Sequence, residues 1–267
     1  MEKIILYYKF VPIADPDMTM RWQRELCTRL NLKGRIIISK HGINGTLGGK
    51  RENLKLYRRA MSDTKEFKNI MYKWSNGSKE HFPKLKVKVK PEIVSFEAAD
   101  EIVVSENGIE NGGVHLKPEG LHELVKEKGD DVIFYDGRNM YEAQIGRFKN
   151  TIIPKTTTSR DFKVDLENGE IAKHKDKPIV TYCTGGIRCE ILSAMMLNRG
   201  FKEVYQMDGG IVKYGEKYAD DGLWEGKLFV FDDRMQMGFS EKSKDIAECE
   251  TCRTKTSHQV NSTNIRR

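Results

Sequence analysis

Cys183 and Arg188 mark the ends of a six-residue segment, Cys-Thr-Gly-Gly-Ile-Arg, whose residue types suit a reactive thiol. Glycines let backbone N–H groups approach an anionic sulfur, and an arginine adds a fixed positive charge. Cysteines in such surroundings have pKa values lowered from about 8.5 to roughly 3.5–7.5. We therefore expect Cys183 and Arg188 to be catalytic, and the loop between them consists of Thr184, Gly185, Gly186 and Ile187.

A strand and a helix must hold this loop. Residues 179–182 are mostly β-branched or aromatic, as in a buried parallel strand, whereas residues 189–197 are apolar at helical spacing and end before Gly200. A cysteine between a strand and a helix faces N–H groups that lack an intrahelical partner, together with the positive end of the helix dipole. Both favour the thiolate. The alternative is that Cys183 is a buried structural cysteine, which is common for this residue type.

Three further residues are candidates for a supporting role. Asp136 and Arg138 follow an expected buried strand at residues 131–135, and we expect them to brace the domain by charge pairing. Cys189 begins the helix that follows the loop. It either packs in the core or resolves an oxidised Cys183, and the sequence leaves both possibilities open.

The positive charge of the chain is concentrated in its first third. Residues 1–90 contain 21 Lys and Arg against 8 Asp and Glu, a net charge of +13, whereas the whole chain carries +7. Such asymmetry favours a polyanionic partner, although a basic soluble domain would have the same composition. The candidate RNA-binding residues are Arg21 and Arg24 on an expected helix and, alternating along an expected strand, Lys84, Lys86, Lys88 and Lys90. Arginines on a solvated helix face and lysines that protect an edge strand are the competing explanations.

Composition excludes several classes of protein. Hydrophobic residues make up 38% of the chain and charged residues 32%, with no run of 18 or more apolar residues and no signal-peptide pattern at Met1. The five cysteines are too few and too scattered for a disulfide framework in a chain of this size. We therefore expect a cytoplasmic protein without a membrane segment.

A pair of cysteines near the C-terminus has the spacing of a zinc site. Cys249 and Cys252 are separated by two residues, but a structural zinc ion requires four ligands, and only His258 follows them before Ser262. We expect no metal here and interpret this end of the chain as a polar tail.

The order of the expected elements indicates two domains. Residues 1–97 read as strand, helix, strand, hairpin, helix and strand, which predicts a small ferredoxin-like α+β domain, with Asn44-Gly45 in a tight turn. Residues 98–114 contain two Asn-Gly pairs and are expected to be a linker. In residues 115–220 strands alternate with helices, which predicts an α/β domain whose parallel sheet has helices on both faces. Residues 221–267 form a C-terminal extension with its polar tail.

Four separated motifs resemble the rhodanese-domain tRNA uridine hydroxylases, a family within the rhodanese superfamily. They are Ile-Asn-Gly-Thr at 43–46, the cysteine loop at 183–190, Asp-Gly-Gly-Ile at 208–211, and the Trp, Phe-Val-Phe-Asp and Arg pattern at 224–234. The resemblance implies a rhodanese-like second domain and an enzyme that hydroxylates the wobble uridine of certain tRNAs at C5. It also implies tRNA as partner, molecular oxygen as co-substrate and an essential Cys183. No organic cofactor is identifiable, because the sequence shows no flavin or nucleotide fingerprint.

Two other functions are compatible with the same residues. A six-residue cysteine loop is also the size found in sulfur-handling rhodaneses, so Cys183 could carry a persulfide between a donor and an acceptor. A non-catalytic tRNA-binding protein would likewise explain the basic first third.

Overall fold

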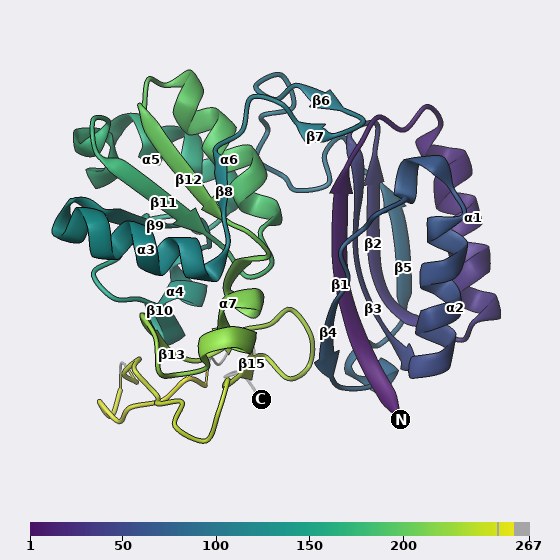
Figure 1. The fold of residues 1–267 in the computed structure, drawn as a ribbon. Helices are drawn as coiled ribbons and strands as arrows, with labels where there is room; N and C mark the ends of the chain where they lie inside the picture. The colour runs from purple at the N-terminus through teal and green to yellow at the C-terminus, as the bar shows by residue number, and fades with distance from the viewer. Residues whose placement is uncertain (250, 259–267) are drawn as a thin grey trace.

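The first domain is a sheet of five strands covered by two helices on one face (Figure 1). The computed structural model describes residues 1–249 and 251–258 of the chain. The strands lie in the order β4-β1-β3-β2-β5. Their bounds are β1 (Glu2–Phe10), β2 (Lys33–Ser39), β3 (Gly42–Lys50), β4 (Lys73–Asn76) and β5 (Leu85–Val89), and the helices are α1 (Pro16–Arg29) and α2 (Arg51–Ser62). Short 3-10 turns lie at Lys65–Phe67 and Lys79–His81.

Local sequence explains how this domain forms. The Asp15 carboxylate accepts a hydrogen bond from the backbone N–H of Met18 at 2.8 Å, so α1 begins with the expected side-chain cap before Pro16. Alternating residues of β1 place Ile5 and Tyr7 in the core beneath the helices. The opposite face of β1 is directed at the second domain.

Two details of the first domain differ from the sequence-based expectation. Asn44-Gly45 does not form a turn: it lies within β3, and the chain reverses at Lys40 and His41 instead. A Cβ atom at Gly45 would lie 2.3 Å from the Tyr7 ring, so this glycine makes room for a neighbouring strand's side chain. The four strands of the ferredoxin-like unit are β1 to β4, and the lysine-rich segment forms an additional edge strand, β5, parallel to β2.

The segment between the domains is ordered and packed. Ile93, Phe96 and Ala98 are buried in an apolar cluster that contains residues of both domains, among them Phe10 and Ile191. A hairpin of β6 (Val104–Ser105) and β7 (Gly108–Ile109) follows, and residue 114, the last of the expected linker, already belongs to a strand of the next sheet.

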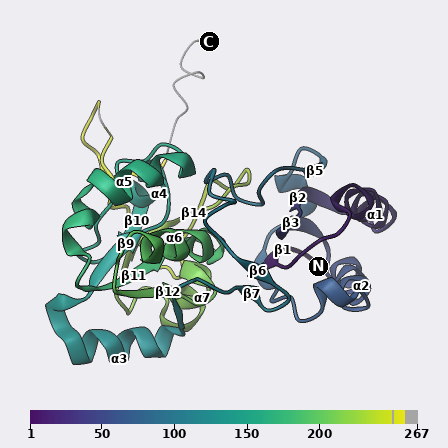
Figure 2. The same ribbon diagram turned by 90° about the horizontal axis from the view of Figure 1, so that it is seen from above.

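The second domain has the expected α/β architecture, a parallel sheet with helices on both faces (Figures 1 and 2). The strand order is β8 (Val114–Leu116), β12 (Glu203–Met207), β11 (Pro178–Tyr182) and β9 (Ile133–Asp136). One face packs on α3 (Pro118–Lys128) and α7 (Gly210–Tyr218), and the other on α5 (Phe162–Asn168) and α6 (Ile187–Asn198). Short 3-10 turns lie at Gly129–Asp131, Ser159–Asp161 and Glu170–His174.

The C-terminal extension is integrated into the second domain. After α4 (Met140–Ile145), strand β10 (Gly146–Phe148) pairs antiparallel with β13 (Trp224–Gly226), and Trp224 is 2% exposed. A second hairpin joins β14 (Leu228–Phe229) to β15 (Gln236–Met237). The polar tail expected at the end falls partly on residues 259–267, which lie outside the described residues, as does Ser262. Within the described ranges, no helix is long and apolar enough to cross a membrane.

Candidate active site

The cysteine loop connects β11 to α6 and wraps its backbone around the Cys183 sulfur. The N–H of Gly186 donates to Sγ at 3.2 Å, and the N–H groups of Arg188 and Cys189 also face the sulfur. Gly186 has a φ of +97°, a conformation that side-chain-bearing residues rarely adopt, so the glycine is required for this curvature. The thiol is therefore buried in a polar cradle rather than in hydrocarbon.

The cradle favours the ionised form of Cys183. Burial alone would raise the pKa of this thiol, but the Cys189 thiol that donates to it, the nearby Arg188 charge and the loop N–H groups lower its pKa to about 5. Cys183 is thus a thiolate at neutral pH. Cys27, buried in the first domain without such partners, provides the contrast, because burial raises its pKa to about 12.

Arg188 does not close the loop by binding the sulfur. Its guanidinium forms two hydrogen bonds with the Glu142 carboxylate, at 2.5 and 2.8 Å, and a weaker one with the Thr184 hydroxyl at 3.3 Å. Glu142 is fully buried and Arg188 is 7% exposed. Arg188 therefore acts on Cys183 through its charge, while Glu142, which sequence reasoning did not select as a site residue, fixes its orientation.

Asp136 and Arg138 form a second buried pair outside the loop. The Arg138 Nη2 atom lies 2.6 Å from Asp136 Oδ2 and also donates to the Gly146 carbonyl at 2.6 Å. Both side chains are fully buried. These contacts join the end of β9 to the start of β10.

The Asp-Gly-Gly segment after β12 supports the cysteine loop from below. The N–H of Ile211 donates to the Cys183 carbonyl at 3.0 Å, and the N–H of Val212 donates to the Thr184 carbonyl at 3.1 Å. A Cβ atom at Gly210 would lie 2.5 Å from the Cys183 carbonyl oxygen. Only a glycine allows the two backbones to come this close, which gives the motif a physical reason.

The first domain closes over the loop, a feature that the sequence did not reveal. A Cβ atom at Gly185 would lie 2.8 Å from a methyl group of Leu6, and one at Gly186 would lie 2.9 Å from the Tyr8 hydroxyl. The Tyr8 hydroxyl also donates to Glu190 of α6 at 3.0 Å. With these strands in place, Cys183 has no exposed surface.

Cys189 lies beneath the loop in the core. Its thiol receives a hydrogen bond from the Thr181 hydroxyl at 3.7 Å, and burial raises its pKa well above the ordinary value. It is a neutral thiol that supports the Cys183 thiolate. Cys249 and Cys252 are the pair with zinc-site spacing. Within residues 1–249 and 251–258, no group of three or more His, Cys, Asp or Glu side chains is placed to hold a metal ion.

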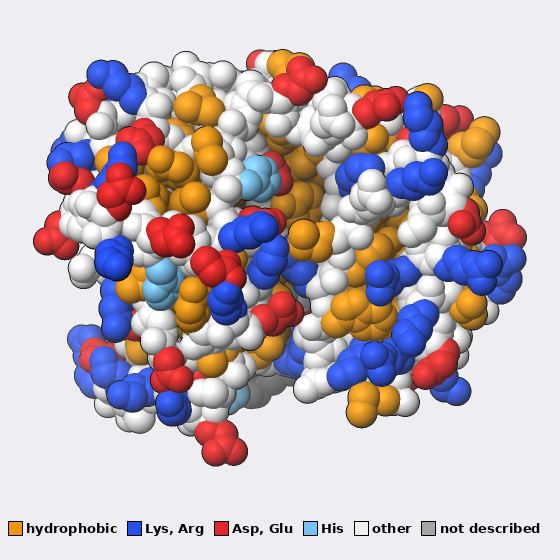
Figure 3. All heavy atoms as spheres, viewed as in Figure 1, with side chains coloured by type: hydrophobic (Ala, Val, Ile, Leu, Met, Phe, Trp, Pro, Cys, Tyr) orange, Lys and Arg blue, Asp and Glu red, His pale blue; other side chains and the backbone are white. Residues whose placement is uncertain are grey.

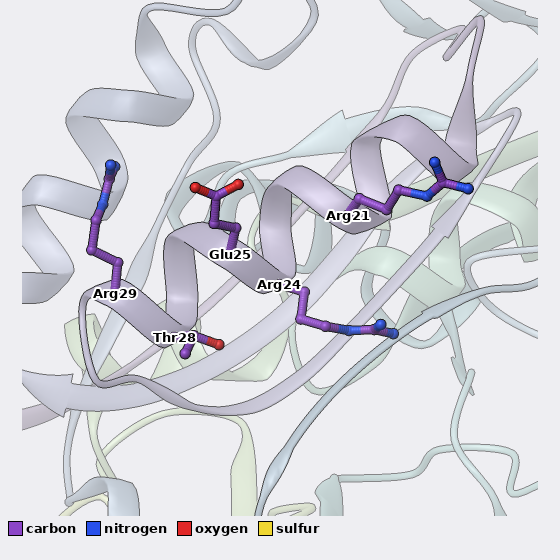
Figure 4. A pocket seen from close by; sticks show the side chains of 5 residues that line it. All are labelled: Arg21, Arg24, Glu25, Thr28 and Arg29. Carbon is purple, nitrogen blue, oxygen red and sulfur yellow. The ribbon is translucent and has the colours of Figure 1, made fainter.

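The candidate RNA-binding residues occupy two places on the first domain, over which many Lys and Arg side chains are visible (Figure 3). On the open sheet face, a groove is lined by Arg35, Ile36, Ile37, Lys86, Lys88 and Lys90. Lys84 is exposed but does not line it. Arg21 and Arg24 lie instead on α1, beside a shallow hollow (Figure 4), and Arg24 donates to the Val87 carbonyl of β5 at 3.2 Å.

Three family models match successive parts of the chain. Residues 2–93 match the UPF0176 acylphosphatase like domain, residues 117–217 the rhodanese-like domain, and residues 225–266 the rhodanase C-terminal family. A solved rhodanese-related protein from Thermoplasma volcanium covers 39% of this chain and 92% of its own, at 19% identity and a TM-score of 0.32, a likeness too weak to support an argument.

Relatives of similar length share much more of the sequence. A tRNA uridine(34) hydroxylase from Corynebacterium urealyticum is 56% identical over 266 residues, which cover 99% of this chain and 90% of that protein. A protein of the same name from an Arthrobacter species is 55% identical over 267 residues, with the same coverage of both chains. This chain therefore belongs to the tRNA uridine(34) hydroxylase family.

Proposed function

We propose that this protein hydroxylates the uridine at position 34 of tRNA, the wobble position, with molecular oxygen as co-substrate and Cys183 as nucleophile. The observation that carries the proposal is a thiolate held in a backbone cradle, in a chain whose relatives over 99% of its length are named for this activity. Because tRNA is modified in the cytoplasm, we place the enzyme there. We propose no organic cofactor, because the sequence shows no flavin or nucleotide fingerprint.

The Cys183 thiolate begins the reaction by adding to C6 of the uracil ring. The carbon–sulfur bond forms from the sulfur lone pair, and the π electrons of the C5–C6 double bond move toward the C4 carbonyl. C5 becomes an enolate carbon that can join an oxygen atom of O2. The O–O bond of the resulting C5 hydroperoxide then breaks as two external thiols supply two electrons and two protons and become a disulfide. One oxygen atom stays on C5 as a hydroxyl group, and the other leaves as water. Expulsion of the thiolate from C6, with loss of the C5 proton, then restores the aromatic base.

Arg188 assists without touching the base. Its charge favours the thiolate both before addition and after release, and its orientation is fixed by Glu142. Within the loop, Gly186 acts through its backbone N–H, which donates to the sulfur, and Thr184 acts through its hydroxyl, which accepts from Arg188.

The basic groove is suited to the tRNA backbone. Arg35 and Lys86 are paired across β2 and β5, as are Ile37 and Lys88, so these side chains share one sheet face. On the same face of the sheet, Leu6 and Tyr8 of β1 cover the cysteine loop. Three strand spacings separate β5 from β1, about 14 Å, a distance that a few nucleotides readily span. Lysines on this face would bind phosphates while a base reaches Cys183.

The test compares tRNA nucleosides by mass spectrometry. Cells that lack the gene are complemented with the wild-type chain, with Cys183→Ser or with Cys252→Ser, a matched change at an exposed cysteine. We expect 5-hydroxyuridine with the wild type and with Cys252→Ser, and none with Cys183→Ser. Undiminished product with Cys183→Ser would reject the role of this thiol. Rapid thiocyanate formation from thiosulfate and cyanide, without any hydroxylated nucleoside, would instead favour sulfur transfer.

A further inference from the structure

Lys73 is a buried lysine on the face of the first domain that meets the second. In the antiparallel pairing of β1 and β4 it lies opposite Leu6, so the two side chains leave the same face of the sheet. Lys73 is 8% exposed, and its amine lies 5.0 Å from the centroid of the Tyr8 ring. Lysines are rarely buried without a carboxylate partner, so this position requires an explanation.

The neighbours of Lys73 place it over the cysteine loop. Leu6 lies opposite Lys73 and the Tyr8 ring lies beside its amine, and these are the side chains that a Cβ atom at Gly185 or Gly186 would meet first. The side chain of Lys73 therefore lies along the contact between β1 and the cysteine loop. A pyrimidine that reached Cys183 from the domain boundary would lie between the loop and this strand face.

The acidic residues near Lys73 are already paired with other groups. Glu190 accepts from the Tyr8 hydroxyl and lies 3.4 Å from the imidazole of His115. Asp208 pairs with Lys213 at 2.6 Å. Throughout the described part of the chain, no carboxylate lies within ion-pair distance of the Lys73 amine. A cation in such a position is suited to negative charge that arrives with, or develops on, the substrate.

We propose that Lys73 is a catalytic residue contributed by the first domain, whose ammonium donates a hydrogen bond to the O4 oxygen of uracil while Cys183 adds at C6. This inference rests on the proposed function. As the carbon–sulfur bond forms, the π pair of C5–C6 moves onto the C4–O4 unit, and O4 becomes an enolate oxygen. The ammonium stabilises that charge, and the step consumes neither oxidant nor reductant.

The charge states of the two groups are compatible with this role. Burial lowers the pKa of Lys73 to about 8, although the charge of Cys183 acts in the opposite direction. Between about pH 5 and pH 8, Cys183 is a thiolate while Lys73 is still an ammonium. The titratable groups that face Lys73 from the surrounding elements are Tyr8, Cys183, Glu190, Asp208 and Lys213.

The experiment measures single-turnover hydroxylation at saturating tRNA across this pH range, for wild type, Lys73→Met and Lys73→Arg. Loss of one preorganised donor to a developing oxyanion predicts a rate about 100-fold lower for Lys73→Met, with unchanged tRNA affinity. Lys73→Arg should retain more of the rate, and its rate should no longer decline above about pH 8, because arginine does not titrate there. The control is Lys126→Met on the exposed side of α3, which should leave both the rate at saturation and the tRNA affinity unchanged.

Three results would overturn the inference. The first is a Lys73→Met rate within about threefold of wild type at saturating tRNA. The second is an equal loss of rate in Lys73→Met and Lys73→Arg, each with the wild-type pH profile, because that result indicates a packing role. The third is a loss of tRNA affinity without a loss of rate. If the wild-type protein itself makes no 5-hydroxyuridine, the proposed function fails, and the role of Lys73 fails with it.

Discussion

Replacement of Glu142 by Gln tests whether a buried charge pair holds the arginine of the cysteine loop. Glutamine has the same shape and keeps one oxygen acceptor. It lacks the negative charge of the carboxylate that now accepts two hydrogen bonds from Arg188. Arg188 would remain 7% exposed, with the glutamine oxygen and the Thr184 hydroxyl as its side-chain acceptors among the described residues. A guanidinium left in that state is shielded from water and has lost its paired carboxylate.

The expected loss of stability follows from the burial of both partners. Removal of one member of a buried ion pair costs about 3–5 kcal/mol, and we take about 3 kcal/mol because Arg188 lies near the edge of the site. For a domain of this size each kcal/mol shifts the unfolding midpoint by about 2–4 °C, so the predicted decrease is about 6–12 °C. Trp224 reports on the second domain in a background where Trp22 and Trp74 are replaced by Phe, because the chain has three tryptophans.

The matched control is Glu170→Gln, which removes the same charge from an exposed pair with Lys173. That substitution should leave the midpoint unchanged, since exposed ion pairs contribute little. If Glu142→Gln shifts the midpoint no more than Glu170→Gln, then the pair does not stabilise the loop, and our account of how Arg188 is oriented is wrong.

Three further predictions concern the Cys183 thiolate, the Cys189 donor and the basic groove. The Cys183 thiolate can be followed by its ultraviolet absorbance, with Cys183→Ser as the blank. This absorbance should disappear as pH falls through about 5, because the folded state depresses the pKa of the thiol. A midpoint near 9 would contradict our description of the cradle. Cys189→Ala should raise that midpoint by removing one donor. Double replacement of Lys86 and Lys88 by Ala should weaken tRNA binding and reduce the slope of log affinity against log salt by about 1.4–1.8. An equal effect of Lys126→Ala, on the exposed side of α3, would show that the groove is not the binding surface.

Sequence reasoning was most successful where a feature depends on neighbours in the chain. The cap at Asp15 and the strand, loop and helix around Cys183 follow from local residue types, because each is decided within a few residues. The prediction of a turn at Asn44-Gly45 was wrong because it, too, considered only neighbouring residues. Its local signal is genuine, but pairing with β1 and the bulk of Tyr7 require an extended strand there.

Contacts between distant parts of the chain could not be read from the sequence. Glu142 meets Arg188 from an element 46 residues earlier, and Tyr8 meets Glu190 across 182 residues. No periodicity or spacing encodes such a pair, since it depends on the packing of whole elements. The apolar character of β1 on both faces was a partial signal, because a strand covered by helices on one side only should alternate with polar residues.

The two glycines of the loop show why the domains form one site. Each was explained from the sequence by the needs of an anionic sulfur, but each also leaves the space that Leu6 or Tyr8 occupies. A low-pKa thiolate is the form of cysteine most easily oxidised when it is accessible, and these strands cover it completely. The same sheet face carries the basic groove. The strand face proposed to bind tRNA is therefore also the face that covers the thiolate, so the proposed binding surface and the cysteine loop belong to one site.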